Sequence, residues 1–249
     1  MTTLELDKYF RAVLDIDAFT AAESSLNGLQ VDNGGAPVAK IAFAVDACME
    51  TFKRAREAGA GMLFVHHGLF WGTEQALTGV FRRRLQCLLD ANLALYAAHL
   101  PLDAHGELGN NAALARRLGI VSPAPFGLYH GKKIGFLGAL ETPLSIHQAA
   151  ALVSPDAALF PFGPERNGSC AVISGGGAME VLQAAGEGVD LYVTGEAAHS
   201  AYHLALEGGV NMVCGGHYAT EVWGLRELAR RAAADLSIAV EFLDVPTGL

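Results

Sequence analysis

Histidines and carboxylates follow three short apolar segments of this 249-residue chain. Burying a neutral imidazole costs free energy unless its lone pair is engaged, and the usual partner of that lone pair is a metal ion. In an open parallel sheet, ligands bind just beyond the carboxyl ends of the strands. The sequence therefore predicts a divalent metal site, with two ions, built from the ends of three strands. The residues concerned are His66 with His67, His99 with Asp103, and His217 with Glu221.

The spacing within these groups indicates how their side chains could be directed towards the metal ions. Adjacent strand residues point to opposite faces, but His66 and His67 end their strand and are free to splay towards two ions. His217 and Glu221 lie on one face of a helical turn if a helix begins near His217. The alternative is that Glu221 only complements the positive end of the helix dipole, with His217 in a loop.

Asp103 is the preferred bridging ligand, because a carboxylate binds two cations at once. Pro101 predicts a rigid, non-helical connection before it. His99 has three interpretations: a partner of the ligands, an acid/base group, or a buried structural histidine. The nitrogen and oxygen donors suit zinc, iron, manganese, cobalt or nickel. Cys214 is interpreted as a buried strand thiol rather than a ligand.

Two further groups compete for a functional role. Glu196, His199 and His203 are spaced to share one side of a helix, although Ser200 replaces the glutamate of a zincin motif. We place Glu196 at the mouth of the main site as a catalytic acid/base and the two histidines at an interface or in the core. The loop of Gly175 to Gly177 is either a tight turn or a phosphate-binding helix start.

Strands alternate with helices along the chain, which predicts an α/β fold with mainly parallel, mixed sheets. We expect a linker at residues 122–125, so that residues 1–123 and 210–249 form the metal-site domain and residues 124–209 a second α/β domain. The expected strands are 38–45, 61–65, 93–98, 133–140, 169–173, 189–193, 210–214 and 238–243. The expected helices are 6–14, 46–58, 81–90, 110–118, one after Pro143, 178–185, 194–207 and 220–234.

The composition and net charge of the chain exclude some classes of function. The chain is 51% hydrophobic and 17% charged with a formal net charge of −9, which indicates a folded protein that repels phosphate backbones. Arg82 to Arg84 is interpreted as a solvated helix face rather than a basic patch. Four scattered cysteines, an acidic N-terminus and the lack of a long apolar run predict a cytoplasmic protein without a membrane segment.

Six short motifs, taken together, resemble the Nif-three-like dinuclear metal family, known as GTP cyclohydrolase I type 2 homologues. They occur in the family's order over nearly the whole chain. They are Asn27-Gly28-Leu29-Gln30-Val31, Val65-His66-His67-Gly68-Leu69-Phe70-Trp71, His99-Leu100-Pro101-Leu102-Asp103-Ala104-His105, Gly109-Asn110-Asn111, Thr194-Gly195-Glu196 and Gly216-His217-Tyr218-Ala219-Thr220-Glu221.

The resemblance implies metal ligation by the same five residues: His66, His67, Asp103, His217 and Glu221. It also implies two similar α/β units with the site in a cleft at the carboxyl ends of the strands. The implied assembly is a homohexamer built as a trimer of dimers. The chain is similar to the short form of the family, which lacks an inserted middle domain.

Two functions remain open at this point. The first is a metal-dependent hydrolase, with His99 and Glu196 moving protons; the resemblance implies that it opens the guanine ring of GTP and releases formate. The second is a non-catalytic metal-binding assembly or chaperone-type protein with the same ligands. A nuclease or phosphoesterase ranks below both, because the sequence has no basic track.

Overall fold

The computed structural model describes all residues, 1–249, as a mixed α/β protein. The chain divides into two compact units: residues 1–102 with 225–245, and residues 103–224 with 246–249. This division differs from the expected one, because residues 103–123, 210–224 and 246–249 lie in the second unit. No helix is both long enough and apolar enough to cross a membrane.

The first unit is built on a five-stranded sheet in the order β1-β4-β3-β2-β11. All neighbours are parallel except β1 and β4, so this sheet is mainly parallel as expected. Its strands are β1 (Gly28–Val31), β2 (Lys40–Asp46), β3 (Met62–His67), β4 (Ala94–Ala97) and β11 (Ala239–Phe242). Its helical segments are α1 (Thr3–Leu14), η1 (Ile16–Phe19), α2 (Met49–Glu57), α3 (Gly79–Asp90), most of α4 (Leu100–Ala104) and the later part of α9 (His217–Leu236).

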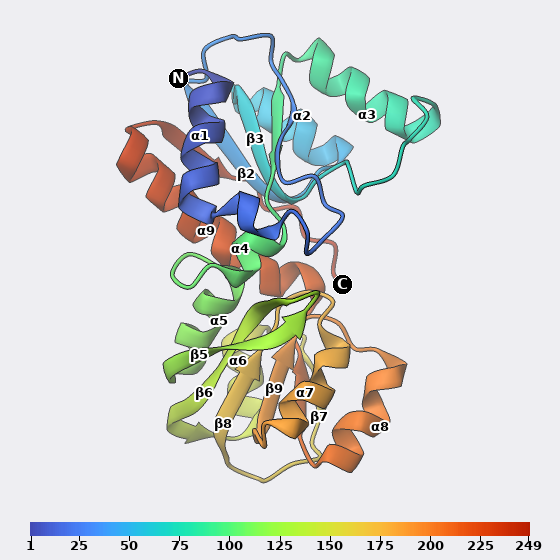
Figure 1. Ribbon diagram of the computed structural model, residues 1–249, viewed down its shortest axis with the longest axis vertical. Helices are drawn as coiled ribbons and strands as arrows, with labels where there is room; N and C mark the ends of the chain where they lie inside the picture. The colour runs from blue at the N-terminus through green and yellow to red at the C-terminus, as the bar shows by residue number, and fades with distance from the viewer. The chain divides into compact units, whose positions relative to one another are not determined.

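Helices cover both faces of this sheet (Figure 1). On one face Phe10 of α1 packs against the rings of Phe43, Phe64 and Tyr96, one from each of three adjacent strands. The alternate strand residues, among them Leu63, belong to a second core cluster with residues of α2 and α3. Burial on both faces explains why β2 and β3 read as continuous apolar runs rather than alternating ones.

The second unit contains a six-stranded sheet in the order β5-β6-β8-β9-β10-β7. Only the β8–β9 and β9–β10 pairs are parallel; the outer strands join antiparallel. The strands are β5 (Ile120–Tyr129), β6 (Lys132–Leu144), β7 (Ala158–Phe160), β8 (Asn167–Val172), β9 (Leu191–Thr194) and β10 (Asn211–Cys214). The helical segments, besides the last residues of α4 and the start of α9, are α5 (Asn110–Leu118), α6 (Ile146–Val153), η2 (Ala178–Glu180), α7 (Val181–Gly186) and α8 (His199–Gly208).

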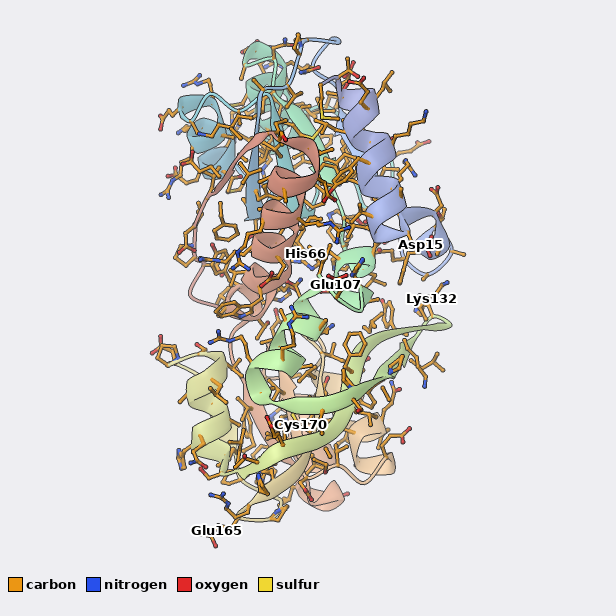
Figure 2. All side chains as sticks on the ribbon, turned by 90° about the vertical axis from the view of Figure 1, so that its left-hand side faces the viewer. Asp15, His66, Glu107, Lys132, Glu165 and Cys170 are labelled. Atoms are coloured by element: carbon orange, nitrogen blue, oxygen red, sulfur yellow. The ribbon has the colours of Figure 1, made fainter.

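The core of this unit lies between the sheet and helices α5 and α6, where Leu114, Ala149, Cys170 and Val193 are fully buried. Cys170, labelled in Figure 2, lies on β8. Helices α7 and α8 pack together and contact the opposite face (Figure 1). The mixed α/β architecture is therefore confirmed in both units.

Several expected boundaries were wrong. The expected linker at 122–125 is part of edge strand β5, where Pro123 and Pro125 are tolerated and the register shifts between Val121 and Ala124. Pro101 does not prevent a helix: it lies in the first turn of α4, where its missing N–H costs nothing. The helix expected from 194 begins only at His199.

Other expectations about local structure are confirmed. Helix α5 spans the expected residues and ends at Gly119, whose φ of +75° is the left-handed geometry of a C-terminal cap. Helix α9 begins at His217, as the shared-face interpretation of His217 and Glu221 required. Asp46, expected as a helix cap, instead ends β2, and Cys48 precedes α2 as its N-cap.

Candidate metal centre

Three histidines of the first unit form a compact group, here called the histidine cluster: His66, His67 and His99. His66 and His67 are the last two residues of β3, and His99 comes two residues after the neighbouring strand β4. One ring nitrogen of each lies within 4.8 Å of the others. His66 is fully buried at the end of its strand (Figure 2), whereas His67 and His99 keep 20% and 23% of their side-chain surface exposed.

Each ring of the histidine cluster is held through its Nδ1 atom by an oxygen. Nδ1 of His66 lies 3.0 Å from the carbonyl oxygen of Ala98, and Nδ1 of His67 lies 2.8 Å from Oδ1 of Asp46. A carbonyl or an ionised carboxylate only accepts, so the proton belongs on Nδ1 and the lone pair on Nε2. Metal-binding histidines in proteins are oriented by this kind of outer hydrogen bond.

The third ring is held by a buried carboxylate that the sequence analysis missed. Nδ1 of His99 lies 2.5 Å from Oε2 of Glu23, whose side chain is only 5% exposed. The other carboxylate oxygen accepts from Asn27 Nδ2 and from the backbone N–H of Leu100. Asn27 Oδ1 in turn accepts from the backbone N–H of His99. The only sequence signal near this network was the motif beginning at Asn27.

A second group, here called the carboxylate cluster, lies in the second unit and consists of Asp103, His217 and Glu221. Asp103 is 6% exposed, and its Oδ1 accepts from Asn110 Nδ2 at 2.9 Å and Ser174 Oγ at 3.0 Å. A carboxylate oxygen of Asp103 lies within 4.8 Å of one of Glu221. Two neutral donors thus hold this buried carboxylate in place.

His217 lies between two carboxylates at the start of α9. Its Nε2 is 3.2 Å from Oε1 of Glu221, one turn further along the helix, and its Nδ1 is 2.6 Å from Oε1 of Glu196. The hydrogen bond to Glu221 is the largest cause that raises the pKa of His217 to about 9, and Glu196 adds to it against the opposing effect of burial. Negative charge therefore concentrates here and attracts cations.

The loop of Gly175 to Gly177, which follows β8, contacts the carboxylate cluster. Gly175 has a φ of +62°, and a Cβ atom there would overlap the Glu221 carboxylate and lie 3.1 Å from His217 Nε2. Its N–H donates to Thr220 Oγ1, and its carbonyl accepts from the N–H groups of Gly195 and Glu196. The loop is a tight turn whose glycine lets the backbone approach the two side chains.

The competing group around α8 is not assembled as the sequence suggested. Glu196 precedes the helix, and its carboxylate contacts His217 instead. His199 and His203 are exposed on α8, rather than in the core. The shared helix face was wrong because the chain between β9 and α8 turns back to the glycine loop before the helix begins.

The donor set suits a divalent cation of intermediate hardness. It combines imidazole nitrogens with carboxylate oxygens and contains no thiolate, because Cys214 is buried in β10 and burial raises its pKa to about 12. All the strands that carry these residues end in them or shortly before them, as ligand sites of parallel sheets do. Both clusters could hold a metal ion.

The chain is a mixed α/β protein with groups of His, Asp and Glu side chains that could hold a metal ion. The chain belongs to the Duf34/NIF3 (NGG1p interacting factor 3) family, whose sequence model matches residues 1–247. The resemblance expected from the six motifs is therefore confirmed.

Three relatives illustrate the match. The chain is 42% identical to a GTP cyclohydrolase 1 type 2 homolog of Treponema pallidum and 45% identical to one of Archaeoglobus fulgidus, in both cases over the full length of both chains. The crystal structure of TTHA1606 from Thermus thermophilus superimposes with a TM-score of 0.89 at 38% identity and covers all of both chains.

Proposed function

We propose that this protein is a metal-dependent hydrolase that uses two divalent ions held by His66, His67, Asp103, His217 and Glu221. The observation that carries the proposal is the hydrogen bonding of the histidines. Nδ1 of each of the three ligand histidines faces an oxygen, which leaves Nε2 as the coordinating atom. Metal-binding histidines are commonly oriented by such an outer hydrogen bond.

His99 and Asp103 are separated by one turn of α4. Five donor residues exceed the four positions of a single tetrahedral ion, which favours two ions. Bound divalent ions supply Lewis acidity and lower the pKa of water towards neutrality.

The remaining polar residues have separate roles in this proposal. The hydrogen bond to Glu23 keeps the ring proton of His99 on Nδ1, so that Nε2 is the nitrogen that can accept a proton. Glu196 orients His217, and its 54% exposed side chain links that histidine to solvent for proton exchange. These assignments follow general acid–base catalysis, in which a positioned group moves a proton at the reacting atom.

For the substrate we propose a guanine nucleotide, on the basis of the relatives named GTP cyclohydrolase 1 type 2 homolog. The reaction would be hydrolytic opening of the imidazole ring of GTP with release of formate. One water adds across the C8=N7 double bond and the C8–N9 bond breaks, which leaves a formyl group on N7. A second water hydrolyses this formamide to formate and a free amine.

The test compares untagged wild-type protein with His217→Ala and with His147→Ala, an exposed histidine of α6 that serves as a matched control. We expect two metal equivalents per chain in wild type and control by elemental analysis, a reduced content in His217→Ala, and formate release from GTP only in the first two. Full metal occupancy without formate release would reject GTP. Absence of turnover across a broad hydrolase screen would instead favour the non-catalytic metal-binding function. Unchanged metal content in His217→Ala would reject the ligand set.

A further inference from the structure

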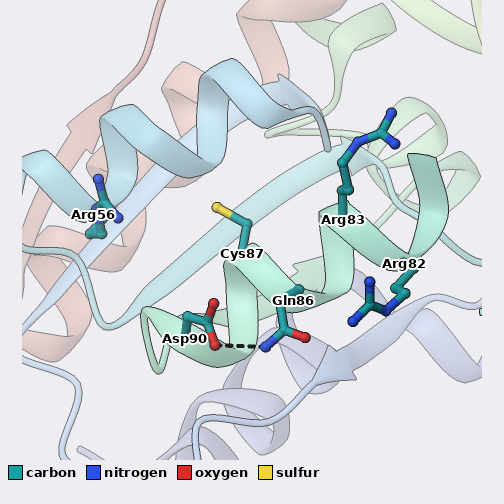
Figure 3. Close-up of a pocket in the computed structure, with 6 residues that line it drawn as sticks. All are labelled: Arg56, Arg82, Arg83, Gln86, Cys87 and Asp90. Carbon is teal, nitrogen blue, oxygen red and sulfur yellow. Dashed lines mark hydrogen bonds between the residues drawn. The ribbon is translucent and has the colours of Figure 1, made fainter. Parts of the chain in front are cut away.

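An open hollow of about 280 Å³ lies between α2 and α3 in the first unit, in a region that the proposed hydrolase does not use. Figure 3 shows its lining, here called the arginine hollow: Arg56 from α2 and Arg82, Arg83, Gln86, Cys87 and Asp90 from α3. Arg83, Gln86, Cys87 and Asp90 follow at helical spacing, so one stripe of α3 faces α2.

The arginines of this hollow differ from the others in the chain. Of twelve arginines, eight hydrogen-bond to or form an ion pair with an acceptor. The other four have no such partner, and all of them lie on α2 and α3: Arg56, Arg82, Arg83 and Arg84. The Nε atom of Arg84 is moreover buried without a hydrogen-bond acceptor. The unpaired guanidinium groups are therefore confined to two helices that contact each other, and three of the four line the arginine hollow.

This arrangement carries an electrostatic cost. Arg82 and Arg83 lie close to the N-terminus of α3, where the helix dipole is positive and no acidic residue occupies the first turn. Asp90 is the one carboxylate of the lining, and it accepts a hydrogen bond from Gln86 Nε2 at 2.7 Å rather than pairing with an arginine (Figure 3). A chain with a net charge of −9 had carboxylates available to neutralise these groups.

We propose that the arginine hollow binds the phosphate group of a small phosphorylated molecule. Guanidinium groups match phosphate oxygens with paired, charge-assisted hydrogen bonds, and a bound anion would offset both the mutual repulsion and the helix dipole. The hollow has room for a phosphate with a small organic group. Arg82 and Arg83 are exposed, as expected of a solvated helix face, and the proposal assigns that face a ligand.

The test uses metal-free protein in a chelator, so that phosphate bound at the metal ligands does not contribute. Inorganic phosphate and glycerol 3-phosphate are titrated separately while the arginine Nε–H signals are followed by NMR. We expect saturable binding with a Kd of about 1 mM or tighter, weakened by added KCl. Tighter binding of glycerol 3-phosphate than of phosphate would identify a phosphomonoester as the ligand, and the reverse order free phosphate.

Two triple variants separate this site from general charge effects. Arg56→Gln, Arg82→Gln and Arg83→Gln together should weaken binding at least about 10-fold, because each lost contact is a charge-assisted hydrogen bond. The control carries the same charge change at three exposed arginines that do have acceptors, Arg116, Arg166 and Arg230, and should bind within about 2-fold of wild type. The single variant Arg83→Gln provides the same comparison should the triple variant not fold. Equal affinity in both triple variants, or no saturable binding up to about 10 mM, would overturn the proposal.

Discussion

Replacing Gly175 by alanine should damage the carboxylate cluster without removing any of its members. The new methyl group would overlap the carboxylate of Glu221 and lie 3.1 Å from Nε2 of His217. Glu221 is 2% exposed, so its side chain has little room to withdraw. Metal affinity should fall by roughly 100-fold, the upper end of the effect of disturbing groups that support metal ligands.

The stability cost has two parts that add. A φ of +62° in a non-glycine residue costs about 1–2 kcal/mol, and forcing an extra carbon into a filled site costs about 1–3 kcal/mol. Alanine also reduces the conformational entropy of the unfolded chain, which returns about 0.4–1 kcal/mol to the free energy of unfolding. The free energy of unfolding of the metal-free protein should therefore fall by about 2–4 kcal/mol, measured by urea denaturation.

Two glycines of the same unit serve as controls. Gly188 has a φ of +70° and open space around it, so Gly188→Ala should show the backbone strain alone, about 1 kcal/mol, and full metal binding. Gly176 has neither a positive φ nor a near neighbour, and Gly176→Ala should be close to neutral. If Gly175→Ala matched Gly188→Ala in both stability and metal affinity, the proposed contact with Glu221 would be refuted.

Three further predictions concern single groups. Glu23→Gln should place an amide N–H against the ring of His99 and move its proton to Nε2; two-dimensional imidazole ¹⁵N spectra would show the change of tautomer, and spectra identical to wild type would contradict it. The raised pKa of His217, about 9 against its ordinary 6.5, means that its stabilising charge is fully present below about pH 6.5 and lost as the pH rises through 9. Urea denaturation of metal-free protein should follow this trend, and His217→Ala should flatten it. Burial raises the pKa of the Cys170 and Cys214 thiols, so Ellman's reagent should label two of four thiols in native protein and all four in urea; four fast thiols in the native state would contradict the burial.

Much of the candidate centre could be predicted because its signals are local. One apolar run ends in His67 and another precedes His217. Each run marks a strand end that lies within a few residues of a candidate ligand. The i, i+4 spacing of His217 and Glu221 fixes their shared helix face once α9 begins at His217. The alternation of strands and helices was sufficient for the mixed α/β class.

The second sheet was only partly predictable. Strands β8, β9 and β10 are mostly buried and read as apolar runs, but edge strand β5 contains two prolines and mostly exposed residues. Its strand character comes from pairing with β6, which local sequence does not record. Pro101 predicted a non-helical connection, although its place in the first turn of α4 is compatible with a helix.

The sequence by itself determined which residues could bind a metal and at which strand ends they stand. Only the tertiary structure decided what orients them: Glu23 lies 76 positions from His99 in the chain, and Ser174 lies 71 from Asp103. It also decided that three of the four unpaired arginines line one hollow. The physical reason is range: hydrophobic periodicity is written in neighbouring residues, whereas a hydrogen bond or an unpaired charge depends on which distant side chains folding brings alongside.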